Sequence, residues 1–236
     1  MNYPIIPYRI FPLGDAALTI DFGNTISQNI NKEVIARFNQ LQQQPVPGTI
    51  EMIPAYNSLT IYYDVMGLKK KTNNFNAVFE WMKERLEEKL KIPVQENAIK
   101  ERVIRIPVCY ESEFSPDLEQ LATTKNISVD EVIEIHTSET YKVYMLGFLP
   151  GFAYMGEVDD KIAMPRKSQP QNVVAGSVGI AGKQTGIYPL ASPGGWQIIG
   201  RTPLKLFDIE REEPVLLKAG DAIHFFSISK DEFKNF

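Results

Sequence analysis

The chain has 236 residues, of which 44% are hydrophobic and 23% are charged, so it carries enough apolar material for a globular core. Its formal charge of −4 excludes the basic excess that binding to a phosphate backbone requires, and no nucleic-acid partner is expected. The single cysteine, Cys109, excludes an internal disulfide. It lies in a strand-like run, where we expect a small core residue in a reducing compartment.

The ends and the apolar runs carry no membrane signal. Pro4, Pro7 and Pro12 interrupt the continuous apolar centre that a signal peptide would need. The longest uncharged apolar run, Val143–Gly156, is too short and too broken by glycine and proline to span a bilayer. We therefore expect a cytoplasmic protein that does not act at a membrane.

The first part of the chain begins with strand and helix patterns. Residues 8–22 predict a pair of strands around a Gly-Asp turn. Ser27 is placed to cap a helix in which apolar residues recur at three- and four-residue spacings: Ile30, Val34, Phe38 and Leu41. Pro45 and Pro47 end this helix.

Two more strands and a second helix follow. Strand-like runs cover Thr49–Pro54 and Ser58–Tyr63, and the lysine run 69–71 is typical of a solvated loop. A helix is then predicted from apolar residues at helical spacing: Phe75, Val78, Phe79, Met82, Leu86 and Leu90. The order predicts an α+β N-terminal domain over residues 1–92, and the polar segment 93–101 is expected to be a linker.

The second part opens with a strand, Arg102–Tyr110, and two short helices. Ser115 is followed by proline at the first helical position, and Ser128 precedes Glu131 in a possible capping box. His136 shares the apolar face of the second helix, so it is either a core histidine or a functional one. From residue 141 onward, short strands separated by glycine and proline predict a mainly-β barrel or sandwich over residues 102–236.

Glycine marks the region where function should be sought. Ten of the 15 glycines fall between Gly147 and Gly200, and residues 184–200 contain no charge. Polar groups on apolar bodies in this segment are typical of a ligand-lined or partner-lined cleft: Tyr188, Ser192, Trp196 and Gln197. The alternative is a β-domain whose tight turns simply need glycine.

Familiar catalytic signatures are absent from the sequence. The stretch before Lys183 has Ser177 where a phosphate loop needs glycine, and Gln184 where it needs Ser or Thr, so no ATP site of that type is expected. Two histidines are too few for a zinc site, and no metal is predicted. No GxSxG elbow surrounds Ser177 or Ser192.

Two arginines beside prolines are candidate anion clamps. Arg166 lies in Met-Pro-Arg and Arg201 in Gly-Arg-Thr-Pro, and each planar fork suits a carboxylate or phosphate. The alternative is that each arginine braces irregular backbone by donating to loop carbonyl groups.

The motifs resemble those of a known family. GFLPGFAYMG (147–156), MPR (164–166), the long run AGSVGIAGKQTGIYPLASPGGWQIIGRTP (175–203), LFD (206–208) and AGDAIHF (219–225) resemble the KipI, or allophanate hydrolase subunit 1, family. Its members are largely read as the B subunit of 5-oxoprolinase. With PLGDAALTIDFG (12–23) also in pattern, the resemblance covers essentially the whole chain.

The resemblance implies an α+β N-terminal domain followed by a mainly-β, cyclophilin-like barrel domain. It also implies two partners, the related barrel protein known as the C subunit of 5-oxoprolinase and the A subunit of the same enzyme. Together they would open 5-oxo-L-proline to L-glutamate with ATP hydrolysis. ATP would be used by the complex and not bound by this chain alone. No Met-Lys-Met motif occurs, so no biotin is expected on this chain.

Residue roles follow by hypothesis from motif position and side-chain chemistry. His136 is the candidate proton-transfer group, and Arg201 is assigned with it to catalysis, so Arg201→Ala is expected to abolish complex activity and leave the fold intact. Arg166 or Arg201 would pair with the substrate carboxylate. The remaining substrate-binding wall is predicted to comprise Gln184, Tyr188, Ser192, Gly194, Gly195 and Trp196.

Two other function classes stay open. The first is inhibition of a sporulation sensor histidine kinase, with an exposed apolar cleft as the docking surface. The second is a role in an allophanate- or urea-processing enzyme, because homologous modules occur in urea carboxylases. Prolyl isomerase activity is not expected, since a barrel fold does not by itself carry function.

Overall fold

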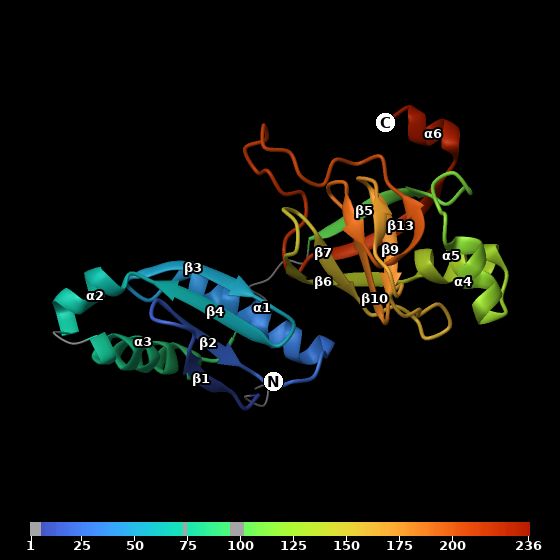
Figure 1. Cartoon of the computed structure of the whole chain (residues 1–236). Helices are drawn as coiled ribbons and strands as arrows, with labels where there is room; N and C mark the ends of the chain where they lie inside the picture. Colours follow the sequence, from blue (N-terminus) through green and yellow to red (C-terminus); the bar gives the residue numbers. More distant parts are fainter. Residues whose placement is uncertain (1–5, 73–74, 95–101) are drawn as a thin grey trace. The chain divides into compact units, whose positions relative to one another are not determined.

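The computed structural model describes residues 6–72, 75–94 and 102–236. The chain divides into two compact units, Met1–Lys100 (the sheet unit) and Glu101–Phe236 (the barrel unit). In Figure 1 the colour bar gives the residue numbers by which each unit can be found. The expected linker covers residues 93–101, and of these, residues 95–101 lie outside the described residues.

The sheet unit is a mixed α and β structure. Its described strands form an antiparallel sheet in the order β1-β2-β4-β3. Its elements are β1 (Arg9–Pro12), β2 (Ala17–Asp21), α1 (Gln28–Gln43), β3 (Thr49–Pro54), β4 (Ser58–Tyr63), α2 (Val65–Thr72) and α3 (Phe75–Leu90). Alternate strand residues such as Leu18 and Ile61 join Val34 of α1 and Met82 of α3 in one buried cluster. The period-2 and period-3.6 patterns of the sequence therefore meet in a shared core.

Two local expectations for the sheet unit need correction. The lysine run Lys69–Lys71 lies in the last turn of α2 and not in a loop, and cations at that end complement the negative end of the helix dipole. Ser27 has the extended backbone of an N-cap residue, but its side chain makes no capping hydrogen bond. The predicted start of α1 is correct, and the predicted cap contact is not present.

In the barrel unit, seven strands of the described residues close into a barrel in the order β10-β7-β6-β13-β5-β12-β9. A separate ribbon pairs β8 with β11. The elements are β5 (Val103–Cys109), α4 (Leu118–Lys125), α5 (Val129–Ser138), β6 (Thr140–Leu146), β7 (Ala153–Gly156), β8 (Gln171–Val173), β9 (Ser177–Ala181), β10 (Gln184–Ile187), β11 (Ser192–Gly194), β12 (Gln197–Arg201), β13 (Ala222–Ile228) and α6 (Lys230–Lys234). Of the two predicted architectures, the barrel is the correct one.

The starts of α4 and α5 differ in how they use their capping residues. Ser128 caps α5 as expected, since its side chain accepts a hydrogen bond from the backbone N–H of Glu131. At α4 the N-cap residue is Asp117 rather than Ser115, whose hydroxyl instead donates to the carbonyl of Tyr110 at 2.8 Å. The Asp117 side chain does not cap the helix, so its carboxylate is available for other contacts.

Candidate functional site

The glycine-rich segment, Gly147–Gly200, contains β7 to β11, most of β12 and the turns between them. Two of its glycines are required by close approach. A Cβ on Gly176, which has φ +84°, would collide with the backbone oxygen of Thr202, and a Cβ on Gly194 would collide with the ring and hydroxyl of Tyr188. Both positions exclude larger residues, as expected where a backbone passes directly over another group.

An aromatic cluster lies beside these turns, and we define it by Phe152, Tyr154, Tyr188 and Trp196. Phe152 meets Trp196 edge to face with ring centroids 5.4 Å apart, and it meets Tyr188 in the same way at 5.2 Å. Phe152, Tyr188 and Trp196 are buried. Such perpendicular pairs add to the apolar burial and hold each ring in one orientation.

Phe148 extends this cluster to the surface. Its side chain is 61% exposed, and its ring lies edge-on to Phe152 and Tyr188, with centroids 5.6 and 6.4 Å away. Its φ of +68° is a left-handed value that costs a residue with a Cβ about 1–2 kcal/mol. An exposed aromatic side chain on a strained backbone is more typical of a binding surface than of a stabilising contact. Phe148 lies in the family motif GFLPGFAYMG (147–156), but the sequence analysis did not nominate it as a site residue.

Arg166 lies at the edge of the aromatic cluster. It is exposed, and its guanidinium carbon is 5.9 Å from the centroid of the Trp196 ring. Burial raises the pKa of Tyr188 and of Tyr154, and the charge of Arg166 acts on both in the opposite direction. The structure thus brings together Arg166, Tyr188 and Trp196, three of the residues nominated from the sequence.

Arg201 occupies a different environment. Its Nε donates to the carbonyl oxygen of Ala175 at 2.9 Å, and its guanidinium carbon is 5.8 Å from the centroid of the Phe233 ring in α6. These contacts match the bracing role that was left open as the alternative for both arginines. Of the two arginines, Arg166 is the exposed one beside the aromatic cluster.

His136 is completely buried in the barrel unit. Its ring stacks on Phe225 with centroids 4.6 Å apart. Its Nδ1 lies 2.7 Å from the hydroxyl oxygen of Tyr110, and its Nε2 lies 3.1 Å from Oγ1 of Thr185. Both ring nitrogens are therefore occupied by side chains of the protein.

The directions of the hydrogen bonds around His136 follow from the hydroxyl group of Thr185. Thr185 donates its hydroxyl hydrogen to the carbonyl of Gly179, so its oxygen must accept from Nε2–H of His136. Nδ1 is then an acceptor for the Tyr110 hydroxyl, and the ring is neutral. Burial lowers the pKa of His136 from 6.5 to about 3, which agrees with that state. The proton-transfer role predicted for His136 receives no support from this geometry, which is that of an internal brace.

The other predicted wall residues lie on β10 in the barrel, on β11 in the ribbon and in the turn after β11. Gly194 passes over Tyr188, and the position of a Cβ on Gly195 is 4.0 Å from Cβ of Arg166. Ser192, opposite Val173 in the β8–β11 ribbon, has a buried hydroxyl oxygen without a hydrogen-bond partner. Gln184 begins β10 and is half-buried. An unpaired buried hydroxyl is costly to the stability of the fold.

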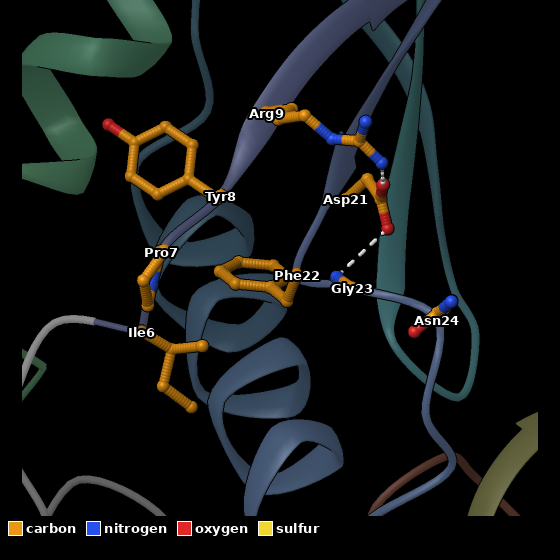
Figure 2. A pocket seen from close by; sticks show the side chains of 8 residues that line it. All are labelled: Ile6, Pro7, Tyr8, Arg9, Asp21, Phe22, Gly23 and Asn24. Atoms are coloured by element: carbon orange, nitrogen blue, oxygen red, sulfur yellow. Dashed lines mark hydrogen bonds and ion pairs between the residues drawn. The ribbon is translucent and has the colours of Figure 1, made fainter.

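A pocket of about 490 Å³ lies in the sheet unit, and none of the site residues that the sequence nominated is among the residues that line it (Figure 2). Its apolar side includes Tyr8 and Phe22, whose ring centroids are 6.1 Å apart, and Arg9 pairs with Asp21 at 2.7 Å at the rim. The lining residues are Ile6, Pro7, Tyr8, Arg9, Asp21, Phe22, Gly23 and Asn24. The two charged residues neutralise each other, and the pocket offers no nucleophile or metal ligand set.

The described residues contain neither a metal-ligating cluster nor a helix that could span a membrane. No group of three or more His, Cys, Asp or Glu side chains is arranged to hold a metal ion among residues 6–72, 75–94 and 102–236. In the same ranges, none of the helices has the length and apolarity needed to cross a bilayer. Cys109 is free and buried at the end of β5.

Comparisons with known proteins agree on one family. The family "Carboxyltransferase domain, subdomain C and D" matches residues 8–217. The B subunit of 5-oxoprolinase from Bacillus subtilis is 46% identical over 230 residues, which cover 97% of this chain and 96% of that relative. The B subunit of 5-oxoprolinase from Escherichia coli O157:H7 is 36% identical over 218 residues, which cover 92% of this chain and 94% of that relative.

A solved structure extends the likeness to the fold. The urea carboxylase of Kluyveromyces lactis superposes with a TM-score of 0.70 at 21% identity, covering 97% of this chain and 22% of that one. At this identity the likeness concerns the fold alone. The resemblance read from the motifs is confirmed by the family match and by the relatives. The chain belongs to the carboxyltransferase subdomain C and D family, in the branch that contains the B subunits of 5-oxoprolinase.

Proposed function

We propose that this chain is the B subunit of an ATP-dependent 5-oxoprolinase, which hydrolyses 5-oxo-L-proline to L-glutamate. The observation that carries this proposal is the 46% identity to a protein of that name over nearly the full length of both chains. The barrel, which the family resemblance implies to be cyclophilin-like, would supply one wall of the substrate site.

The candidate site suits the chemistry of this substrate. 5-Oxoproline combines an uncharged five-membered lactam with a carboxylate. The exposed guanidinium of Arg166 can pair with the carboxylate, and the exposed ring of Phe148 can lie against the lactam. The buried rings of Tyr188 and Trp196 support these two side chains from behind. A site with one cation beside apolar rings selects such a ligand over a fully charged or fully apolar one.

The need for ATP follows from the stability of the lactam amide. Transfer of the terminal phosphoryl group to the lactam oxygen creates an electrophilic carbon that water can attack. The C–N bond then breaks, with the ring nitrogen leaving as the amino group, and the product is an acyl phosphate of glutamate. A second water hydrolyses this acyl phosphate, which releases phosphate and glutamate. In this proposal a partner chain holds ATP, and this chain carries neither metal nor biotin. Its residues bind and orient the substrate.

The proposed partners are the C subunit of 5-oxoprolinase, which is a second barrel protein, and the A subunit, in a hetero-oligomer. The relatives are named as B subunits, which supports an assembly of several chains. Phe148 and the exposed residues Leu190, Ala191 and Pro193 supply surface that such a partner could cover.

The proposal is tested by isolating the tagged chain from its native lysate and measuring glutamate released from 5-oxoproline with and without ATP. We expect ATP-dependent release that is lost in a lysate lacking the chain and restored by adding it. Arg166→Ala should raise KM for 5-oxoproline about tenfold or more, because a charge-assisted hydrogen bond is lost. Lys218→Met is the matched control, since it removes a lysine from an exposed ion pair with Glu213 in the same unit. Release of glutamate that is independent of this chain would refute the proposed function.

A further inference from the structure

The segment that carries Arg166 is held by an internal ion pair. Lys167 Nζ lies 2.6 Å from Oδ2 of Asp117, and the two side chains are only 15% and 11% exposed. Fifty positions separate the two residues along the chain, so no local sequence pattern links them. A charged pair with so little solvent is costly to desolvate and demands precise geometry, so its place beside the candidate site needs a reason.

Asp117 is hydrogen-bonded to β12 in addition to its ion pair with Lys167. Its Oδ2 accepts a hydrogen bond from the backbone N–H of Ile198 at 2.6 Å, and its own N–H donates to the Ile198 carbonyl at 3.0 Å. The Asp117 carboxylate does not cap α4. It instead links the start of α4 to β12, the strand that follows Trp196.

Further bonds connect the residues beside Arg166 to the residues beside Trp196. The carbonyl of Pro165 accepts from Nε2 of Gln197 at 2.9 Å, and the N–H of Lys167 donates to the carbonyl of Gly195 at 2.7 Å. The residues on either side of Arg166 are thus hydrogen-bonded to the residues on either side of Trp196. The Lys167 ammonium also donates to Oε1 of Gln171 at 2.8 Å.

We propose that the Asp117–Lys167 ion pair is a positioning device that holds Arg166 over Trp196 and thereby sets the affinity of the site for the substrate carboxylate. Neither residue needs to touch substrate, because both act through Arg166. The inference rests on the proposed function for the identity of the substrate. The placement of Arg166 itself can be measured without it.

The first test measures the placement of Arg166 in the full-length chain by NMR. The side-chain resonances of Arg166 should carry a ring-current shift from Trp196, which the Trp196→Leu variant identifies by abolishing it. We expect Lys167→Met to remove most of this shift and Lys167→Arg to retain it. Asp117→Asn, which keeps a side-chain acceptor for Ile198, should also reduce it, and this milder change serves if Lys167→Met fails to fold. An unchanged shift in Asp117→Asn and Lys167→Met would overturn the proposal.

The second test is a double-mutant cycle on the assembled enzyme. Lys167→Met should raise KM for 5-oxoproline about tenfold with little change in kcat, and Lys167→Arg should recover most of the affinity. In an Arg166→Ala background, Lys167→Met should have no further effect on KM. Additive effects would show that Lys167 acts independently of Arg166, which contradicts the inference. If Arg166→Ala leaves KM unchanged, the proposed substrate contact fails, and the NMR result still decides whether the ion pair positions Arg166.

Discussion

Lowering the pH from 7 to 5 should destabilise the barrel unit through one residue, His136. In the folded chain its imidazole is buried, neutral and bonded at both nitrogens, and burial lowers its pKa from 6.5 to about 3. In the unfolded chain the same side chain binds a proton near its ordinary pKa. Between these two values the unfolded state carries one proton more than the folded state, so stability falls as the pH falls.

The size of the effect follows from the two pKa values. His136 destabilises the fold little above pH 6.5, and the penalty grows as the pH drops toward 3. Each pH unit within that window changes the free energy of unfolding by about 1.4 kcal/mol. We therefore expect this residue to cost about 2 kcal/mol at pH 5 relative to pH 7, or more than a tenth of the stability of an ordinary domain.

The assay uses the two tryptophans as reporters of separate units. Trp81 lies in α3 of the sheet unit and Trp196 lies in the barrel unit, so a Trp81→Phe background reports barrel unfolding through Trp196 fluorescence. Urea unfolding is measured at pH 7 and pH 5 for this background and for the same chain with His136→Gln. The difference between the two chains isolates the contribution of His136 from that of the carboxylates.

Equal losses of stability in both chains between pH 7 and pH 5 would refute this reasoning. Because His136→Gln removes a buried side chain with two hydrogen bonds, it could fold poorly, and a second measurement avoids that risk. The chain contains two histidines, so His224→Gln leaves His136 as the single imidazole for NMR. Its Nδ1 should remain unprotonated in the folded protein at pH 5, and a protonated ring at that pH would contradict the burial argument.

Two further predictions concern residues around the candidate site. Phe148→Gly should raise the free energy of unfolding by about 1 kcal/mol, because glycine adopts φ +68° without strain, and urea unfolding would measure it; a loss of stability would show that the ring contacts outweigh the strain. Arg201→Ala should lower the free energy of unfolding by about 1 kcal/mol, because the carbonyl of Ala175 loses its donor. The same measurement checks it, and unchanged stability with lost turnover of the complex would instead favour the catalytic role predicted from sequence.

The elements that the sequence predicted well are those with a strong local period. Apolar residues three and four apart along α1 and α3, and alternating residues along β2 and β4, determine which face of each element is buried. α2 escaped prediction because its eight residues contain a lysine run and a glycine, and it has no clear apolar stripe.

The sequence also indicated which segment carries the candidate site. The concentration of glycines, the uncharged stretch 184–200 and the family motifs all indicated the segment that now carries Arg166, Tyr188 and Trp196. The sequence could not decide between the two arginines. Arg166 and Arg201 sit in similar proline-flanked motifs, and their difference arises from what lies opposite each side chain in space.

Only the tertiary structure decided the roles that depend on distant partners. The sequence placed His136 on an apolar helix face, but its burial is set by Tyr110, Thr185 and Phe225, which arrive from three different strands or strand ends. The Asp117–Lys167 pair likewise forms across 50 positions. Local spacing determines which face of a helix or strand is apolar. Burial, protonation and ion pairing depend on which other segments fold against that face, and no pattern within a short window carries that information.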